Sequence, residues 1–152
     1  MYLKAIEWQV EQLDEINQSD SCQLLLKTYA EYYKQIGYHV PGIGYFVVKD
    51  HETVGSCGFK GQPKDGKVEI AYWTFDGFEG QGIASFSGKE LVSICEQTDP
   101  AITIIATTAP EHNASTRILT KNGFLFSAIV QDHEIGDAWE WSLSKTSADA
   151  DG

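Results

Sequence analysis

The chain has few cysteines and no long apolar run, and each shortage excludes a class of protein. Its three cysteines, Cys22, Cys57 and Cys95, are odd in number and widely spaced. That is not the pattern of a disulfide framework, so we expect reduced, buried thiols. No apolar run approaches the ~20 residues of a membrane-spanning helix, and the N-terminal segment lacks the basic start and apolar centre of a signal peptide. These features predict a cytoplasmic protein with no membrane partner.

Basic residues are also scarce. The chain has 11 Lys and Arg residues against 22 Asp and Glu residues, and its formal net charge is −11. Nucleic-acid binding needs a basic surface, so a nucleic-acid partner is not expected. A negative field favours cationic ligands such as amines, although acidity can equally serve solubility alone. The histidines show no metal-ligand spacing and no Cys-x-x-Cys pair is present, so no metal site is predicted.

What remains is a globular composition, with 42% hydrophobic and 12% aromatic residues in a chain of 152. This length suits one domain that buries its own core, which we place at residues 1–145. Residues 146–152 are small, polar and acidic, and we expect them to form a flexible tail. Either a monomer or a homodimer is compatible with these features.

Hydrophobic periodicity predicts an alternation of helices and strands. The order is one helix, three strands joined by short polar turns, a second helix, a buried strand, a third helix and two final strands. A degenerate opening strand at residues 2–6 precedes them. Mixed connections of this kind indicate an α+β or layered α/β domain with a mixed sheet. The expected helices cover 21–36, 82–97 and 113–122, and the expected strands cover 45–49, 53–59, 68–75, 102–107, 124–130 and 138–143.

A glycine-containing segment joins the third of these strands to the second helix. The strand ends near Phe75, and Gly80-Gln81-Gly82-Ile83-Ala84-Ser85 opens the helix. Glycines allow a tight turn, and the first N–H groups of a helix lack partners within it and attract anions. The segment is therefore either an anion-binding site or a glycine-rich connection that binds no ligand. A P-loop would need Gly-Lys-Ser/Thr where the chain has only Gly88-Lys89-Glu90, and a dinucleotide fingerprint would need a third glycine or alanine where Ser85 stands.

A second motif follows about 30 residues later, between Asn113 and Phe124. The two stretches together resemble the GNAT N-acetyltransferases, in particular the RimJ/RimL-like branch. That branch reads Glu-Ile-Gly-Tyr-Trp, then Gln/Arg-Gly-x-Gly-x-Ala, then Asn-x-x-Ser-x-Arg-x-Leu-x-Lys-x-Gly-Phe. The matching residues here are Glu69 to Trp73, Glu79 to Ala84, and Asn113, Ser115, Arg117, Leu119, Lys121, Gly123 and Phe124. The resemblance implies a GNAT fold, in which a mostly antiparallel mixed sheet is splayed open between two central strands and flanked by helices.

The same resemblance implies that acetyl-CoA lies in the gap between those strands. The end of the third strand would pair its backbone with the pantetheine arm, the glycine segment would present N–H groups to the pyrophosphate, and Asn113 would bond the cofactor near the thioester. Glu79 stands where the branch has Gln or Arg, and we expect it to point to solvent. The predicted cofactor residues are Trp73, Thr74, Phe75, Gly80, Gln81, Gly82, Ile83, Ala84, Ser85 and Asn113.

Acetyl transfer to an amine needs a base for the amine and benefits from an acid for the leaving thiolate. Glu69 is the candidate base, ahead of Glu111 and Glu134; alternatively it is a solvated or salt-bridged strand residue. Ser115 is the candidate acid, because Leu119 occupies the position where many GNAT enzymes carry a tyrosine. Alternatively, Ser115 caps a helix.

The predicted function is therefore N-acetyl transfer from acetyl-CoA to a primary amine, which is a small amine, an amino acid or a peptide N-terminus. The alternative is a non-catalytic acyl-CoA-binding module of the same fold, favoured by Leu119 and Glu79. Tyr29, Tyr32, Tyr33 and Tyr38 either line a pocket for a cationic acceptor or pack the first helix.

Overall fold

The computed structural model describes residues 1–6, 19–37 and 42–144. Every predicted helix and strand is present, with ends moved by at most a few residues, and the degenerate opening strand is β1. Tyr38 and the tail at 146–152 lie outside the described residues. The elements are β1 (Tyr2–Ala5), α1 (Asp20–Ile36), β2 (Gly44–Lys49), β3 (Glu52–Phe59), β4 (Lys67–Thr74), α2 (Ile83–Thr98), β5 (Thr103–Thr108), α3 (Ala114–Lys121), β6 (Leu125–Asp132) and β7 (Gly136–Ser144).

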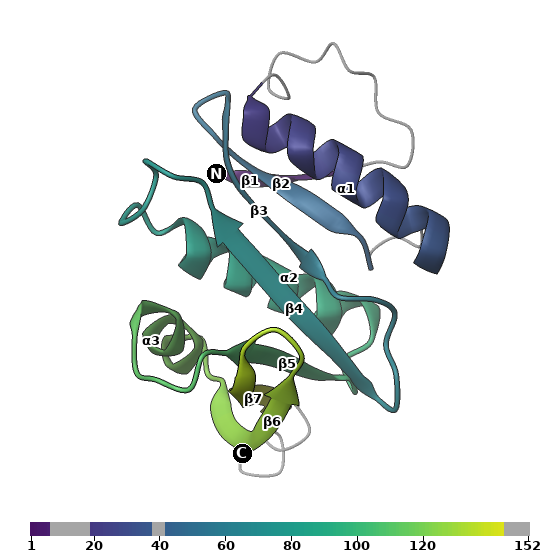
Figure 1. Cartoon of the computed structure of the whole chain (residues 1–152), viewed down its shortest axis with the longest axis vertical. Coiled ribbons are helices and arrows are strands. Elements are labelled where there is room, and N and C mark those ends of the chain that lie inside the picture. Colours follow the sequence, from purple (N-terminus) through teal and green to yellow (C-terminus); the bar gives the residue numbers. More distant parts are fainter. Residues whose placement is uncertain (7–18, 38–41, 145–152) are drawn as a thin grey trace.

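The strands form one seven-stranded sheet in the order β1-β2-β3-β4-β5-β7-β6, and α1 lies against it on the side away from α2 (Figure 1). Two glycines of β3 show how the helices approach so closely. A Cβ at Gly58 would lie 3.3 Å from the Tyr29 hydroxyl of α1, and a Cβ at Gly55 would lie 3.2 Å from Ile83 of α2. Because strand residues alternate between faces, these two positions receive the two helices on opposite sides. No helix in the described ranges is long and apolar enough to cross a membrane.

The tyrosines of α1 pack against the core. Tyr33 is 1% exposed, and its hydroxyl donates to the Ile6 carbonyl (2.7 Å) and accepts from the Gly44 N–H (3.1 Å). Tyr29 and Tyr32 pack against the same core cluster. The packing interpretation is therefore confirmed for these three side chains, because the Tyr33 hydroxyl and all three rings join α1 to the core.

The sheet is splayed between β4 and β5, as the resemblance implied. These strands run parallel, and they pair only where Lys67–Glu69 meets Thr103–Ile105. Beyond that point the described residues of β4 pair with β3 alone, and those of β5 pair with β7 alone. The two strands diverge toward α3 and the start of α2 (Figure 1). The fold is thus α+β, with a gap between two central strands that leaves one edge of each without a strand partner.

Gly58→Ala tests how tightly the sheet is built. The new Cβ would lie 2.9 Å from both the Gly44 Cα and the Ile43 carbonyl oxygen, which are backbone atoms that cannot move aside. We expect the free energy of unfolding in urea to fall by about 1–3 kcal/mol. Gly88→Ala is the matched control, since its Cβ would meet only the flexible end of Asn122, at 2.8 Å. Because Ala also gains ~1 kcal/mol of helix propensity there, equal losses for both variants would contradict the prediction.

Candidate active site

The connection from β4 to α2 depends on left-handed glycines. Gly80 and Gly82 have φ of 78° and 79°, a region that residues with a Cβ rarely adopt. A Cβ built at either position would meet no atom within 4 Å. Glycine is therefore required here by the backbone conformation and not by packing, and the loop borders open space.

The start of α2 leaves backbone donors available beside that space. Its N-cap is Gly82, which provides no side-chain cap, whereas α1 and α3 are capped by the side chains of Ser19 and Asn113. The first helical hydrogen bond of α2 runs from the Phe86 N–H to the Gly82 carbonyl (3.0 Å). The N–H groups of residues 83–85 precede this bond and lie at the positive end of the helix dipole. This arrangement suits a phosphate group.

Two side chains of the loop are held by specific contacts. Glu79 is exposed, and its Oε2 accepts from the Gly77 N–H at 3.0 Å, so the carboxylate is engaged within its own turn. Gln81 Oε1 accepts from the Lys49 ammonium at 3.1 Å. Lys49 is the last residue of β2, and sequence reasoning missed it because 32 residues separate it from Gln81. Only the fold brings this cation to the loop.

The predicted base, Glu69, and the predicted acid, Ser115, line one pocket in the gap between β4 and β5. A pocket of about 140 Å³ there is lined by Glu69 and Tyr72 of β4, Thr107 of β5, and Ser115 and Leu119 of α3, among others. Glu69 and Ser115 are far apart in the sequence, so their place in the lining of one pocket is a consequence of the crossover through α2. The loop residues do not line this pocket, and lie where α2 begins.

Glu69 is salt-bridged, as one of its two interpretations proposed. Its Oε2 lies 3.1 Å from the Lys60 ammonium, and the side chains are 25% and 56% exposed respectively. An ion pair this exposed contributes little free energy, so it holds Glu69 only weakly. Glu69 thus both pairs with Lys60 and lines the cleft, and the ion pair does not prevent it from acting as a base.

The capping alternative for Ser115 is wrong. The N-cap of α3 is Asn113, which has an extended backbone (φ −148°). Its Oδ1 accepts from the Thr116 N–H (3.1 Å), and the Thr116 hydroxyl accepts from the Asn113 N–H (2.9 Å). Asn113 Nδ2 also donates to Glu111 (3.1 Å), so one amide N–H remains for a cofactor. Ser115 lies inside the first turn with its side chain exposed at the cleft.

The end of β4 divides into exposed and buried residues. Trp73 is 41% exposed, and its ring packs edge-on against Phe75 with centroids 4.8 Å apart. Phe75 is 4% exposed, its N–H donates to the Val54 carbonyl (3.0 Å), and its carbonyl accepts from Phe78 (3.1 Å). Both backbone groups of Phe75 already have protein partners, and its N–H points to β3. Because backbone groups alternate between the two edges of a strand, those of Thr74 face the gap and those of Trp73 face β3.

Tyr72 is a further hydroxyl at the cleft that sequence reasoning did not single out. It lines the same pocket as Ser115. Burial raises the pKa of Tyr72 from 10.0 to about 12, so the phenol keeps its proton at neutral pH. Strand alternation alone could not show that it lies near Leu119, the position where the family pattern often has tyrosine.

The described cysteines are free and buried, as expected. Burial raises the pKa of Cys57 from 9.0 to about 12 and that of Cys95 from 9.0 to about 11. Neither thiol lies in the electropositive setting that a nucleophilic cysteine needs. Nor do the described residues hold any group of three or more His, Cys, Asp or Glu side chains arranged for a metal ion.

These buried groups predict a loss of stability in alkali. Between pH 9 and 12 the unfolded chain loses the protons that folded Cys57 and Tyr29 retain, since burial raises the pKa of each to about 12. The folded state then binds more protons, so stability is full below pH 9 and falls as pH rises through this range. Urea unfolding at pH 8, 9, 10 and 11 measures this, and Cys57→Ala should flatten the decline. A flat profile in the native chain would contradict it.

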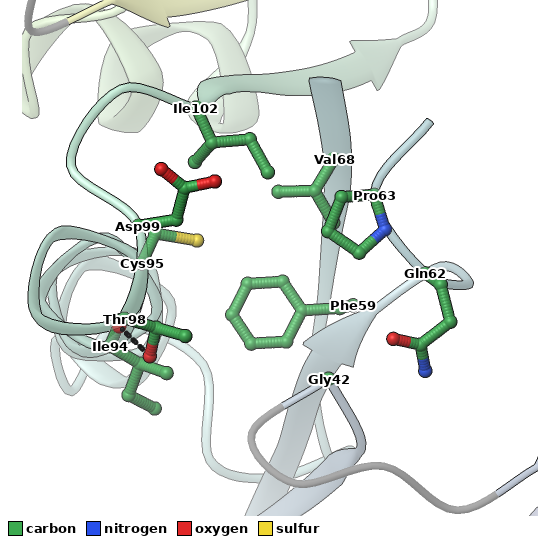
Figure 2. A pocket seen from close by; sticks show the side chains of 10 residues that line it. All are labelled: Gly42, Phe59, Gln62, Pro63, Val68, Ile94, Cys95, Thr98, Asp99 and Ile102. Carbon is green, nitrogen blue, oxygen red and sulfur yellow. Dashed lines mark hydrogen bonds between the residues drawn. The ribbon is translucent and has the colours of Figure 1, made fainter. Parts of the chain in front are cut away.

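A second cavity, of about 150 Å³, lies between the C-terminal end of α2 and the start of β4 (Figure 2). The ring of Phe59 points into it, opposite Val68 and Ile102. Two of its polar side chains already have partners: the Thr98 hydroxyl donates to the Ile94 carbonyl (2.8 Å), and Asp99 accepts from the Ala101 N–H (3.2 Å). None of the predicted site residues lines this cavity, so it is not the candidate active site.

Comparisons with known proteins agree with this geometry. Residues 6–125 match the family model described as "Acetyltransferase (GNAT) domain". An apo crystal form of RimL, a ribosomal L7/L12 alpha-N-protein acetyltransferase, has 19% identity and a TM-score of 0.68, over 93% of this chain and 91% of that chain. The microcin C7 self-immunity acetyltransferase, solved with acetyl-CoA and AMP, has 15% identity and a TM-score of 0.66, over 82% and 70%.

The ribosomal-protein-S5-alanine acetyltransferase from Vibrio fischeri has 15% identity and a TM-score of 0.62, over 86% of this chain and 77% of that chain. No curated protein matches the sequence. At these identities the solved structures establish the fold, and the family model, which spans most of the chain, establishes the family. The chain belongs to the GNAT acetyltransferase family and is an acetyl-CoA-dependent acyltransferase.

Proposed function

We propose that the chain transfers the acetyl group of acetyl-CoA to a primary amine by direct attack in the cleft between β4 and β5. The observation that carries this proposal is the pocket that Glu69 and Ser115 line together where the two strands diverge. The pyrophosphate would bind the N–H groups at the start of α2. The pantetheine arm would run past Trp73 along the free edge of β4, where Thr74 offers its backbone groups, with the remaining amide N–H of Asn113 near the thioester.

The chemistry needs a proton acceptor and a proton donor. Glu69 takes a proton from the ammonium form of the acceptor, directly or through a water molecule, so that the neutral amine can attack the thioester carbonyl carbon. The new C–N bond forms, the C–S bond breaks, and coenzyme A leaves as a thiolate. As the C–S bond breaks, the attacking nitrogen releases its surplus proton. Ser115 protonates the sulfur and takes up the proton from the nitrogen in return, so the serine hydroxyl is restored. An acidic side chain in the cleft also favours the approach of a cationic amine.

The acceptor is a small amine, an amino acid or a peptide N-terminus. The net charge of −11 favours a cationic molecule. Two solved proteins of similar fold have names that describe acetylation of ribosomal proteins. That likeness supports including peptides with a free N-terminus among the candidates.

A non-catalytic acyl-CoA-binding module is the competing proposal. Two observations favour it: Leu119, in the position where tyrosine is common, is a core residue with 1% exposure, and Glu69 is paired with Lys60. In such a module acetyl-CoA would bind without turnover. The cleft would then serve for recognition only.

One experiment separates the two. The protein is incubated with acetyl-CoA and a panel of polyamines, amino acids and basic peptides, and thiol release is followed, while calorimetry measures acetyl-CoA binding. Release that depends on one class of amine supports catalysis. Tight binding without release for any amine supports the module, and absence of binding contradicts both.

Ser115→Ala and Tyr72→Phe identify the proton donor. We expect Ser115→Ala to lower kcat about 100-fold, within the range of lost acid catalysis, and Tyr72→Phe to lower it less than about tenfold. Both side chains line the cleft, and neither change alters charge. Steady-state kinetics with the best acceptor measures both variants. The reverse order would contradict the role of Ser115 and assign the donor to Tyr72.

A further inference from the structure

We propose that Lys49 binds the pyrophosphate of acetyl-CoA, and so supplies from β2 the positive charge that the glycine loop itself lacks. The inference rests on the proposed function, which places the coenzyme at the start of α2. It adds a specificity residue that lies outside both sequence motifs.

The contact with Gln81 places the Lys49 ammonium at the loop. Gln81 lies between the left-handed Gly80 and Gly82, and its Oε1 is 3.1 Å from Lys49 Nζ. The Lys49 ammonium therefore contacts the side chain of the residue that directly precedes Gly82, the N-cap of α2. A phosphate bound to those groups would be within reach of a lysine side chain.

The β2–β3 hairpin fixes where Lys49 lies. Lys49 pairs with Glu52 across a two-residue turn, in which Asp50 and His51 both have positive φ (51° and 63°). Tight hairpins favour glycine or asparagine at such positions, so this turn holds a conformation that costs free energy. The turn ends β2 at Lys49, whose side chain contacts Gln81 of the glycine loop.

Lys49 forms no ion pair with any residue in the described ranges. Lys34 and Lys60 pair with Glu31 and Glu69, but no carboxylate in the described ranges lies within 4.0 Å of the Lys49 ammonium. Its partner is a neutral amide, which accepts one of its three N–H bonds and leaves two for an anion.

The loop has a specific need for this charge. Glu79 stands where the family pattern has Gln or Arg, and its carboxylate is held by the Gly77 N–H at 3.0 Å. Coenzyme A is an anion and the chain carries a net charge of −11, so the global field opposes binding. One lysine in hydrogen-bonding range of a phosphate offsets that repulsion locally.

The test compares the binding of coenzyme A and of dephospho-coenzyme A, which keeps the pyrophosphate and lacks the 3′-phosphate. Isothermal titration calorimetry at low salt is run on the native chain and on Lys49→Met, Lys49→Arg and Lys64→Met. Lys64 is the control. It is exposed in the β3–β4 turn, at the end of β4 opposite the glycine loop, and Lys64→Met removes the same single charge as Lys49→Met. We expect Lys49→Met to lower the affinity for both ligands about tenfold and to make that affinity less dependent on salt concentration. Lys49→Arg should retain most of the affinity, and Lys64→Met should bind like the native chain.

The outcomes separate this inference from the proposal it rests on. If the native chain binds neither ligand, the placement of the coenzyme fails. If the native chain binds and Lys49→Met binds equally well, or Lys64→Met loses as much, only the role of Lys49 is overturned. A loss confined to coenzyme A would assign Lys49 to the 3′-phosphate and overturn the pyrophosphate contact. An equal loss in Lys49→Arg would show a positioning role for the side chain and would also overturn it.

Discussion

Gly82→Ala is expected to weaken coenzyme A binding about 100-fold, which corresponds to ~2.7 kcal/mol, while the chain still folds. Two effects combine. Alanine at φ 79° costs roughly 1–2 kcal/mol and favours a rearranged loop, which would turn the N–H groups of residues 83–85 away from the phosphate. The new Cβ also projects into the open space where the proposed pyrophosphate lies, because no protein atom is within 4 Å of it.

Gly66→Ala is the matched control for this variant. Gly66 has φ 75°, a Cβ there also meets nothing within 4 Å, and it precedes β4 at the end opposite the loop. Both variants should therefore lose a similar free energy of unfolding, roughly 1–2 kcal/mol in urea. Only Gly82→Ala should lose affinity in calorimetry with coenzyme A. Equal affinities for the two variants would exclude the start of α2 as the pyrophosphate site.

The second large effect is expected from Glu69→Gln, which should lower kcat by roughly 10²–10⁴-fold with little change in coenzyme A affinity. An amide has nearly the shape of the carboxylate but cannot accept the amine proton. The change also removes the ion pair with Lys60, whose exposed position makes its contribution to stability small. Steady-state kinetics with the best amine acceptor and urea unfolding of the same sample separate catalysis from stability.

Glu134→Gln is the comparison variant for Glu69. Glu134 is exposed in the turn between β6 and β7, and it was a lesser candidate for the base. We expect its kcat to stay within about threefold of the native value, because a base must lie within hydrogen-bonding reach of the reacting amine. If Glu69→Gln retains full activity, Glu69 is a structural ion-pair residue. If Glu134→Gln is the inactive variant, the base belongs to the β6–β7 turn.

Much of the fold could be predicted because its signals are local. Apolar periodicity located the helices and strands, and short polar turns indicated the antiparallel hairpins. Gly80 and Gly82 could be recognised from sequence, since the left-handed backbone that they adopt is a property of the residue type. Element ends were less certain: β7 begins at Gly136, two residues before the predicted strand, because cross-strand pairing with Asp132 extends the ladder into the turn.

Other features were decided by tertiary structure, because they join residues that are far apart in the chain. Both Asn113 and Ser115 suit a helix start, and only the backbone geometry shows that Asn113 is the cap and that Ser115 is left facing the cleft. The ion pair of Glu69 with Lys60 requires β3 and β4 to pair in one register.

The sequence by itself determined the glycine loop, the helix that begins after it and the family resemblance, since each depends on neighbouring residues and their intrinsic conformations. Only the fold determined that Glu69 and Ser115 line one pocket and that the Lys49 ammonium reaches Gln81. The physical reason is that a side chain acts over a few ångströms. Chain reversals through the β2–β3 hairpin and the crossover through α2 decide which distant side chains come within that range.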